Sequence, residues 1–435
     1  MTRQGLSRDR ISRHLLNARQ IAAIFTAFAL PISTSGQAIG VSILAVLSLA
    51  TLDRDRLNAT MRRPAAYLPL VLLVLLLIGV SWSMLPFNGA IKWVGPYAKL
   101  LLIPLLMASA FTPRQVLEIG FGFLAGCFVV MVLSYTAILW PGGPWGFFNE
   151  PGVPWKDNAI QSECFALCTF GLLFAASRLW LRGERRRAGA AAILGALFFV
   201  NIFLLHISRT GALVALSLLG ILFIQLGGWR RAAMIGAPLL LVIVIGLWSL
   251  PGVQNRIAEI SKGMSQPSRS VDAISTASRI DFWSKAWDFV KAAPIAGHGT
   301  GSIRPLYQSR EATAPSPYGA ATADPHNQFL HIVLQIGLIG GAVLLAMWAA
   351  HAALFFGRDA VSIFGLAIVW MNVLGSLVNS HISQVTQGML YCMAIGLLGA
   401  LVPAQGFPSS ARTCRGSLAA RANARVNDLG ENPSS

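Results

Sequence analysis

Three residues between positions 209 and 326 have side chains suited to displacing a phosphorylated leaving group: Arg209, Arg279 and His326. Two guanidinium groups bind a diphosphate in a bidentate geometry that lysine does not offer. A neutral histidine, whose ordinary pKa lies near 6.5, can remove the proton of an attacking hydroxyl. The three together fit displacement of a diphosphate by an alcohol, and Lys92 would add positive charge to the same site.

Arg209 and Lys92 each have a plain structural alternative to a role in this site. Arg209 lies in LLHISRTGALVAL, where two apolar runs meet with almost no loop between them. An arginine near membrane depth faces a polar cavity or an anion, or it extends its side chain to the interface. Lys92, on a short loop between apolar runs, has the same interfacial alternative.

Arg279 and His326 also have simpler interpretations. Arg279 opens the stretch SRIDFWSKAW, where Ser278 and Asp281 have the spacing of a helix N-cap and its capping box. Taken alone, Arg279 is more often a solvated surface charge. His326 follows a proline in DPHNQ and is equally well explained as a loop residue, although Asp324 is close enough in sequence to orient or charge it.

The elements that must position these residues are predicted to be transmembrane helices. Of the 435 residues, 55% are hydrophobic and 12% charged, and the mean hydropathy is +0.62. A soluble domain carries roughly a quarter of its residues as charged side chains. Long apolar runs favour an all-α polytopic protein with about twelve helices over a β-barrel, which shows short alternating segments. The predicted spans are 19–34, 36–51, 66–84, 95–110, 116–139, 160–178, 188–206, 211–227, 232–250, 327–350, 359–378 and 384–403.

The net charge of +17 is distributed in a way that indicates membrane topology. Basic residues gather at 8–19, 54–63, 178–187, 230–231 and 412–425. Lys and Arg are enriched in cytoplasmic loops. Both termini are therefore predicted to be cytoplasmic, and Arg209, Arg279 and His326 all fall on the opposite face. This order argues against a nucleic-acid partner, since a basic binding patch would need no such topology.

The chain is predicted to be a single integral membrane domain, 1–435. Segment 251–325, between the ninth and tenth predicted spans, is predicted to be a large extracytoplasmic loop, and 404–435 a disordered cytoplasmic tail. The loop contains a predicted amphipathic helix that rests on the membrane surface or packs over the bundle. Its apolar stripe is predicted to consist of Ile280, Trp283, Trp287 and Val290.

Three segments resemble motifs of the O-antigen ligase and polymerase superfamily: SRTGALVAL, SRIDFWSKAWDFVKAAPIAGHGTGS and HNQFLHIVLQIGLIGG. In that pattern an arginine follows a serine at a helix start, and a second arginine precedes an aromatic helix. The aromatic helix ends in a proline and a Gly-x-Gly turn, here Pro294, Gly297, Gly299 and Gly301. A His-Asn pair then opens a helix that runs into Gly-x-x-Gly, here Gly337 and Gly340.

The resemblance implies a metal-independent, inverting glycosyltransferase of the GT-C-like membrane class, with no cofactor. It implies transfer of O-antigen from undecaprenyl diphosphate onto lipid A-core during lipopolysaccharide biosynthesis, at the periplasmic face of the bacterial inner membrane. The partners would be these two lipid-linked substrates and membrane lipid. By position, Arg209 and Arg279 would bind the diphosphate and His326 would be the general base. The pattern's acidic residue near the penultimate loop is not evident in VNSHISQ, where His381 either takes its role or the role is absent.

Three other functions stay open on the sequence. An O-antigen polymerase uses a similar donor but a second lipid-linked glycan as acceptor. A protein O-oligosaccharyltransferase has a larger C-terminal region than the tail of this chain. A lipid-linked glycan transporter would form no bond, although the hydrophilic mass here lies in one loop rather than in two related halves.

Overall fold

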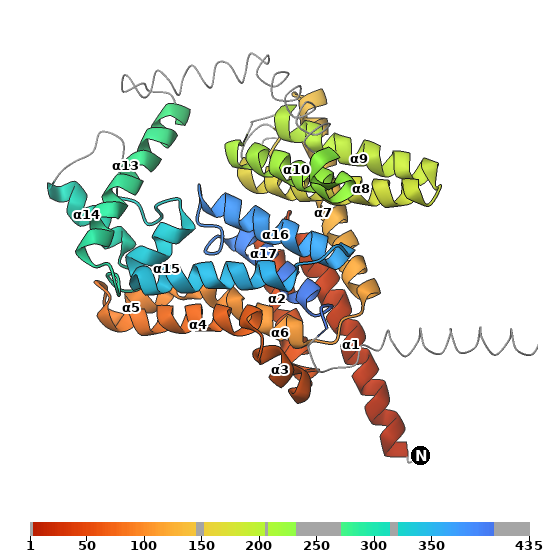
Figure 1. Cartoon of the computed structure of the whole chain (residues 1–435), viewed down its shortest axis with the longest axis horizontal. Coiled ribbons are helices and arrows are strands. Elements are labelled where there is room, and N and C mark those ends of the chain that lie inside the picture. The colour runs from red at the N-terminus through yellow and green to blue at the C-terminus, as the bar shows by residue number, and fades with distance from the viewer. Residues whose placement is uncertain (1–2, 145–151, 205–207, 232–270, 314–320, 404–435) are drawn as a thin grey trace, which may run out of the picture.

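The computed structural model describes residues 3–144, 152–204, 208–231, 271–313 and 321–403. These residues form helices and connecting turns, with no strand among them (Figure 1). The α-helices are α1 (Arg3–Ala29), α2 (Thr34–Ala50), α3 (Arg54–Met61), α4 (Pro64–Gly79), α5 (Phe87–Ala90), α6 (Leu102–Ala108), α7 (Pro113–Leu139), α8 (Asn158–Leu181), α9 (Arg185–Leu204), α10 (Arg209–Arg231), α13 (Val271–Ala292), α14 (Ile303–Thr313), α15 (Gln328–Leu354), α16 (Ala360–Ser376) and α17 (Val385–Gly399). Three 3-10 helices are η1 (Val80–Trp82), η2 (Ile91–Trp93) and η3 (Gly95–Leu101).

Six helices among the described residues are long and apolar enough to cross a membrane, or up to eight if each of two bent pairs counts as one span. The bent pairs are α2 with α3, at 109°, and 87–93 with 95–108, at 47°. Two shorter apolar helices, α16 and α17, add to these. The chain is therefore a multi-pass membrane protein whose described part is all helical.

Each predicted span except 232–250 coincides with a helix or with consecutive helices, and 232–250 lies outside the described residues. The number of candidate crossings is lower than the number of predicted spans because several helices are short, bent or, like α1, partly polar. The predicted tail 404–435 and residues 251–270 and 314–320 of the predicted loop also lie outside the described part.

The core is a large apolar cluster to which helices from the first, middle and last thirds of the chain contribute. α15 packs along α4, α17 packs on α6 and α16, and α8 packs on α9 and α10. In Figure 1 α4 and α15 cross the centre of the molecule, whereas α8, α9 and α10 lie together as a group above them. Large apolar side chains such as Val74, Ile193 and Leu345 are exposed on the outer surface, as expected of helices that face lipid.

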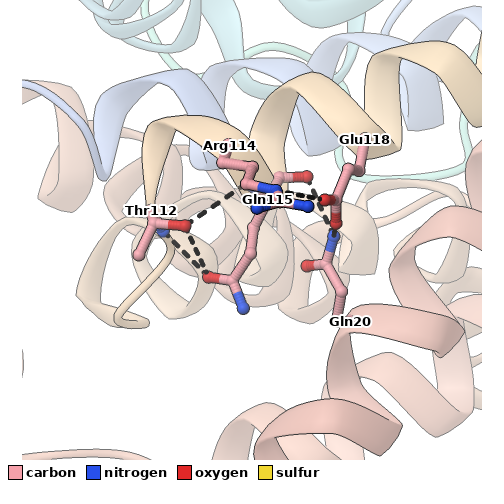
Figure 2. A network of polar contacts seen from close by, with 5 residues as sticks. All are labelled: Gln20, Thr112, Arg114, Gln115 and Glu118. Carbon is pink, nitrogen blue, oxygen red and sulfur yellow. Dashed lines mark hydrogen bonds and ion pairs between the residues drawn. The ribbon is translucent and has the colours of Figure 1, made fainter.

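Polar contacts fix the start of α7 against α1 (Figure 2). Thr112 and Gln115 form a complete capping box, in which each side chain bonds the other's backbone amide. Gln20 of α1 donates to the Gln115 carbonyl at 3.0 Å and to Glu118 at 3.3 Å. Glu118 is also paired with Arg114 at 3.0 Å. Residues almost a hundred positions apart are thereby held at one end of the bundle.

The predicted Gly-x-Gly turn is present between α13 and α14. Gly297, Gly299 and Gly301 have φ values of 66°, 89° and 85°, in the region that favours glycine. The backbone also passes very close to α4's end, because a Cβ on Gly299 would lie 2.4 Å from the Ser83 Cα. We call residues 293–302 the glycine turn.

The glycine turn is bonded to a break in α15. The helix is interrupted at Ile336 and Gly337, where Gly337 has φ 66°. The backbone amides of His298 and Gly299 donate to the freed carbonyls of Leu334 and Gln335, at 2.9 and 2.8 Å. A Cβ on Gly337 would lie 1.9 Å from a backbone oxygen of the turn. Gly337, the first glycine of the Gly-x-x-Gly pair, is therefore the point at which the connection that leaves α13 packs on α15.

The predicted face of the amphipathic helix is wrong in part. Ile280 and Trp287 are 52% and 56% exposed. The face packed on the protein is instead formed by Phe282, Ala286 and Val290, which join a small apolar cluster with α14 and α15. Tertiary contacts, and not the widest apolar stripe, decide which face is covered.

The predicted capping box at the start of this helix is also wrong. α13 begins at Val271, so Ser278 and Asp281 lie inside the helix and Arg279 does not open it. Asp281 is paired instead with Lys285, one turn further along, at 2.8 Å. The spacing of a capping box and of an in-helix pair overlap, and only the true start of the helix separates them.

Candidate functional site

His326 lies at the entrance to α15 in a backbone conformation that few non-glycine residues adopt. Its φ is 53°, and its backbone N–H donates to Asp324 Oδ1 at 2.8 Å. The next residue, Asn327, caps α15 by accepting from the Leu330 amide at 3.0 Å. Such left-handed residues are costly and cluster at functional sites. The local sequence thus turns the chain sharply and holds the imidazole at the end of a helix.

The imidazole of His326 lies against α13. Its ring stacks on Phe282, with 6.5 Å between centroids and 23° between planes. The neighbouring Trp283 donates from Nε1 to the Pro325 carbonyl at 2.9 Å. Trp283, a member of the predicted apolar stripe, and Phe282, which is not, therefore both hold the loop of the catalytic candidate.

Asn379 decides which imidazole nitrogen is free. Asn379 Oδ1 accepts from the Ser380 amide at 3.0 Å, which identifies it as an oxygen, and it lies 3.4 Å from His326 Nδ1. A favourable contact with an acceptor requires the proton on Nδ1. The tautomer assigned in this way leaves the lone pair of Nε2 open to accept a proton.

Asp324 acts on the backbone and not on the imidazole. Its Oδ1 accepts from the His326 amide and, at 2.6 Å, from the Ser380 hydroxyl. Ser380 belongs to the connection between α16 and α17, which we call the α16–α17 turn (residues 377–384). The aspartate expected to orient the histidine therefore does so by tying its loop to this turn.

A buried polar row on the first turns of α15 supports the site from below. Gln328, His331 and Gln335 are spaced to lie along one face of the helix. Tyr97 of η3 bonds this row twice, to His331 Nδ1 at 2.8 Å and to Gln328 Nε2 at 3.2 Å. Gln335 Oε1 accepts from the Gly301 amide of the glycine turn at 2.8 Å. The row thus joins three separate segments beneath His326.

Arg279 lies on the helix that contacts His326. It precedes Phe282 by three positions on α13, so the two residues are neighbours on the helix surface. Its side chain is half-buried. The structure therefore brings the segment of the second candidate arginine beside the histidine.

Arg209 is the first residue of α10, which begins two residues before the predicted span 211–227. Ser208 caps this helix by accepting from the Gly211 amide at 3.1 Å. Gly211 is packed tightly on α8, because a Cβ there would lie 2.2 Å from the Ser162 Cβ. The start of α10 is therefore fixed against the first turns of α8.

Lys92 lies on η2 and is exposed. Its neighbour Trp93 contacts the glycine turn, where a Cβ on Gly301 would lie 2.6 Å from the Trp93 ring. Within the described ranges, no hydrogen bond or ion pair joins Lys92 to His326. The structure thus places Lys92 beside the glycine turn rather than in contact with the histidine.

Two lysines that the sequence did not single out converge on the α16–α17 turn and the start of α17. Lys156 is 8% exposed and donates to Thr386 Oγ1 at 3.1 Å. Burial lowers the pKa of Lys156 below its ordinary value. Lys99 donates to the carbonyls of Ser383, at 3.3 Å, and Gln384. Neither lysine belongs to a motif, and only the fold brings both to one place.

These contacts define a class of protein: a helical membrane protein with a histidine and an arginine-bearing helix gathered at the ends of its helices. Residues 193–345 match the family model described as O-Antigen ligase, so the chain carries an O-antigen ligase family domain over that segment. The family comprises membrane glycosyltransferases of the O-antigen ligase and polymerase type, which use lipid-linked glycans. The match covers Arg209, Arg279 and His326, whereas Lys92 lies outside it. A search of curated proteins gave no match.

Proposed function

We propose that this chain ligates O-antigen from undecaprenyl diphosphate onto a sugar hydroxyl of lipid A-core, at the periplasmic face of the bacterial inner membrane. The observation that carries the proposal is the position of His326, at a strained helix entrance and stacked on the helix that bears Arg279. Both residues lie in the segment that matches the O-antigen ligase family. The proposal includes the topology inferred from charge: about twelve crossings with both termini cytoplasmic.

In this reaction the acceptor hydroxyl attacks the anomeric carbon from the face opposite the diphosphate, which inverts the configuration. His326 Nε2 takes the hydroxyl proton, and Asn379 keeps the proton on Nδ1. The bond from the anomeric carbon to the diphosphate oxygen breaks, and its electron pair stays on that oxygen. Arg209 and Arg279 stabilise the charge that develops there, and Lys92 adds to the positive field.

The first test compares His326→Ala with wild-type protein in a purified system that contains undecaprenyl diphosphate-linked glycan and lipid A-core. Transfer should be abolished while donor binding persists, since the imidazole acts on the acceptor. His351→Gln is a matched control, because His351 is a buried histidine of the same helix that bonds Tyr391 and the Ala65 carbonyl at the other end. Transfer by His326→Ala at the wild-type rate would contradict the general-base role.

The products of the same assay distinguish a ligase from the other candidate functions. Capped lipid A-core supports a ligase, whereas long glycan chains formed without lipid A-core indicate a polymerase. Glycan attached only to an added periplasmic protein indicates an oligosaccharyltransferase. Movement of lipid-linked glycan across the bilayer with no new glycosidic bond indicates a transporter.

The arginine assignment has its own test. Arg209→Lys and Arg279→Lys keep the charge but lose the bidentate geometry, so each should weaken donor binding and lower transfer about tenfold or more. Arg310→Lys is the control, because Arg310 is an exposed residue of α14 whose nearest carboxylate, on Asp288, lies at 3.8 Å. Unchanged donor affinity in both site variants would exclude diphosphate binding by these arginines.

A further inference from the structure

A carboxylate and an imidazole meet inside the helical bundle, away from any surface. Glu163 of α8 and His381 of the α16–α17 turn are 2% and 1% exposed, and Glu163 Oε1 lies 3.1 Å from His381 Nε2. The two groups are within ion-pair distance without the alignment of a hydrogen bond, and within the described residues neither Glu163 oxygen has another donor. Ionisable residues at membrane depth are costly and commonly have a function.

On one side, this pair connects to His326. His381 follows Asn379 and Ser380, and these two residues contact the His326 ring and Asp324. The residues that follow His381 in this turn are also held in place. Gln328 Oε1 accepts from the backbone amides of Ile382 and Ser383, at 2.8 and 3.2 Å. A shift of His381 therefore shifts the groups that hold the histidine.

On the other side, the pair connects to the start of α10. Glu163 follows Ser162, against which Gly211 packs with no room for a side chain. Ser208 caps α10 at this point, so Arg209 begins its helix within a few residues of the contact. A shift of Glu163 therefore shifts the helix end that carries Arg209.

We infer that Glu163 and His381 form a positioning pair that sets the spacing between the Arg209 helix end and His326. The pair supplies a contact between the α8–α10 group and the turn that holds the histidine. It is not itself catalytic, because both side chains are enclosed and no substrate reaches them. This inference rests on the proposed function, in which Arg209 binds the leaving group and His326 the acceptor proton.

Gly375 of α16 provides a way to move His381 without changing any charge. A Cβ on Gly375 would lie 1.7 Å from His381 Cε1, so the imidazole occupies the space that a side chain would need. Gly375→Ala must displace the ring, whereas alanine is otherwise favourable in a helix. Gly220→Ala in α10 is the matched control, because a Cβ there meets nothing within 4 Å.

The experiment measures kcat and the donor KM of folded, purified variants with undecaprenyl diphosphate-linked glycan and lipid A-core. Glu163→Ala should lower kcat about 100-fold with the donor KM within about twofold, since a misplacement near 1 Å costs about that much. Glu163→Gln keeps the shape and should recover part of the loss. Gly375→Ala should lower kcat in the same way, and Gly220→Ala and His351→Gln should not.

A purely structural pair would give a different result. It would lower the yield or the melting temperature and leave kcat per folded molecule unchanged, and that outcome in Glu163→Ala or Gly375→Ala overturns the inference. Should Glu163→Ala not fold, Glu163→Asp, which retracts the carboxylate by one methylene, takes its place. His326→Ala is measured in parallel: activity there contradicts the proposed function, whereas wild-type kcat in the Glu163 variants alone contradicts only the positioning role.

Discussion

At the scale of single residues, the site depends on small polar side chains that hold a few larger groups. Asn379, Ser380 and Asp324 together fix the backbone and the tautomer of His326. None of the three is itself suited to bind a diphosphate. Their contribution is orientation, which in nucleophilic sites decides whether the base presents a lone pair or a proton.

Asn379→Ala tests this orientation directly. The substitution removes the acceptor for the Nδ1 proton, so the unreactive tautomer becomes populated. The contact is long, at 3.4 Å, and we expect a loss of about 1 kcal/mol, or about fivefold in kcat. The donor KM should not change. Asn327→Ala, which removes the α15 cap instead, should lower the melting temperature more than it lowers kcat at the assay temperature.

At the scale of elements, the glycine turn and the break in α15 act as one joint. A glycine suits position 337 because the backbone φ there is positive and Ile295 lies where a side chain would be. The joint fixes where α13 leaves the bundle, and hence where Arg279 and Phe282 lie relative to α15.

Gly337→Ala should disrupt that joint. A Cβ would meet a backbone oxygen at 1.9 Å, and the left-handed backbone is itself unfavourable for alanine. We expect a loss of at least about 2 kcal/mol of stability, which a thermal melt of the purified protein would detect. An unchanged melting temperature relative to Gly220→Ala would show that the backbone relaxes around the new methyl group.

A second contact fixes α13 to α14. Lys285 is paired with Asp281 of its own helix, at 2.8 Å, and with Glu311 of α14. Burial by itself would lower the pKa of Lys285, but the two carboxylates outweigh it and the pKa is raised. Because the folded pKa is raised, the lysine's contribution is complete below its ordinary value of 10.5 and is lost as the pH rises through the folded pKa.

Lys285→Met should therefore loosen α14 at neutral pH. The substitution leaves two partly buried carboxylates without their cation, at a cost of about 2 kcal/mol. Hydrogen exchange of the α14 amides should accelerate. Lys291→Met is the control, since its pair with Asp288 at 3.6 Å is exposed on both sides and contributes little. Equal exchange in the two variants would contradict a buried linkage.

At the scale of the whole molecule, the helix ends divide into two sets. The candidate site gathers His326, the α16–α17 turn and the starts of α8 and α10. The other set joins α15 to the start of α4, where His351 bonds the Ala65 carbonyl and Arg63 bonds the Val402 carbonyl. Charge counting predicts that the second set faces the cytoplasm.

Cysteine labelling tests the sidedness. Gly142→Cys, in the turn after α7, and Arg186→Cys, at the start of α9, place exposed thiols before and after α8 in the sequence. Both are made in a chain whose Cys414 has been replaced by serine. The natural cysteines at 127, 164, 168 and 392 are buried and free. A membrane-impermeant maleimide should label Gly142→Cys in intact spheroplasts and Arg186→Cys only after permeabilisation. The reverse pattern would invert the topology and exclude a periplasmic site.

The sequence by itself determined the helical membrane class and nearly all the described helix positions, and its motifs predicted the family domain that matches residues 193–345. Apolar runs and motif spacing are local properties. It also predicted the glycine turn, since three glycines at alternate positions are suited to a left-handed backbone. It failed at the start and the buried face of α13. A capping box there could not be distinguished from a pair inside a longer helix, and packing against α14 and α15 selected the face.

Only the tertiary structure decided what surrounds His326. The α16–α17 turn, which carries Asn379, Ser380 and His381, is far in sequence from both His326 and Glu163. Their meeting depends on how α8, α15 and this turn pack. Buried polar groups take partners wherever the fold brings a complementary group within reach, and no spacing in the sequence records that distance. The sequence could therefore propose the types of the candidate reacting residues, whereas it could not give their orientation.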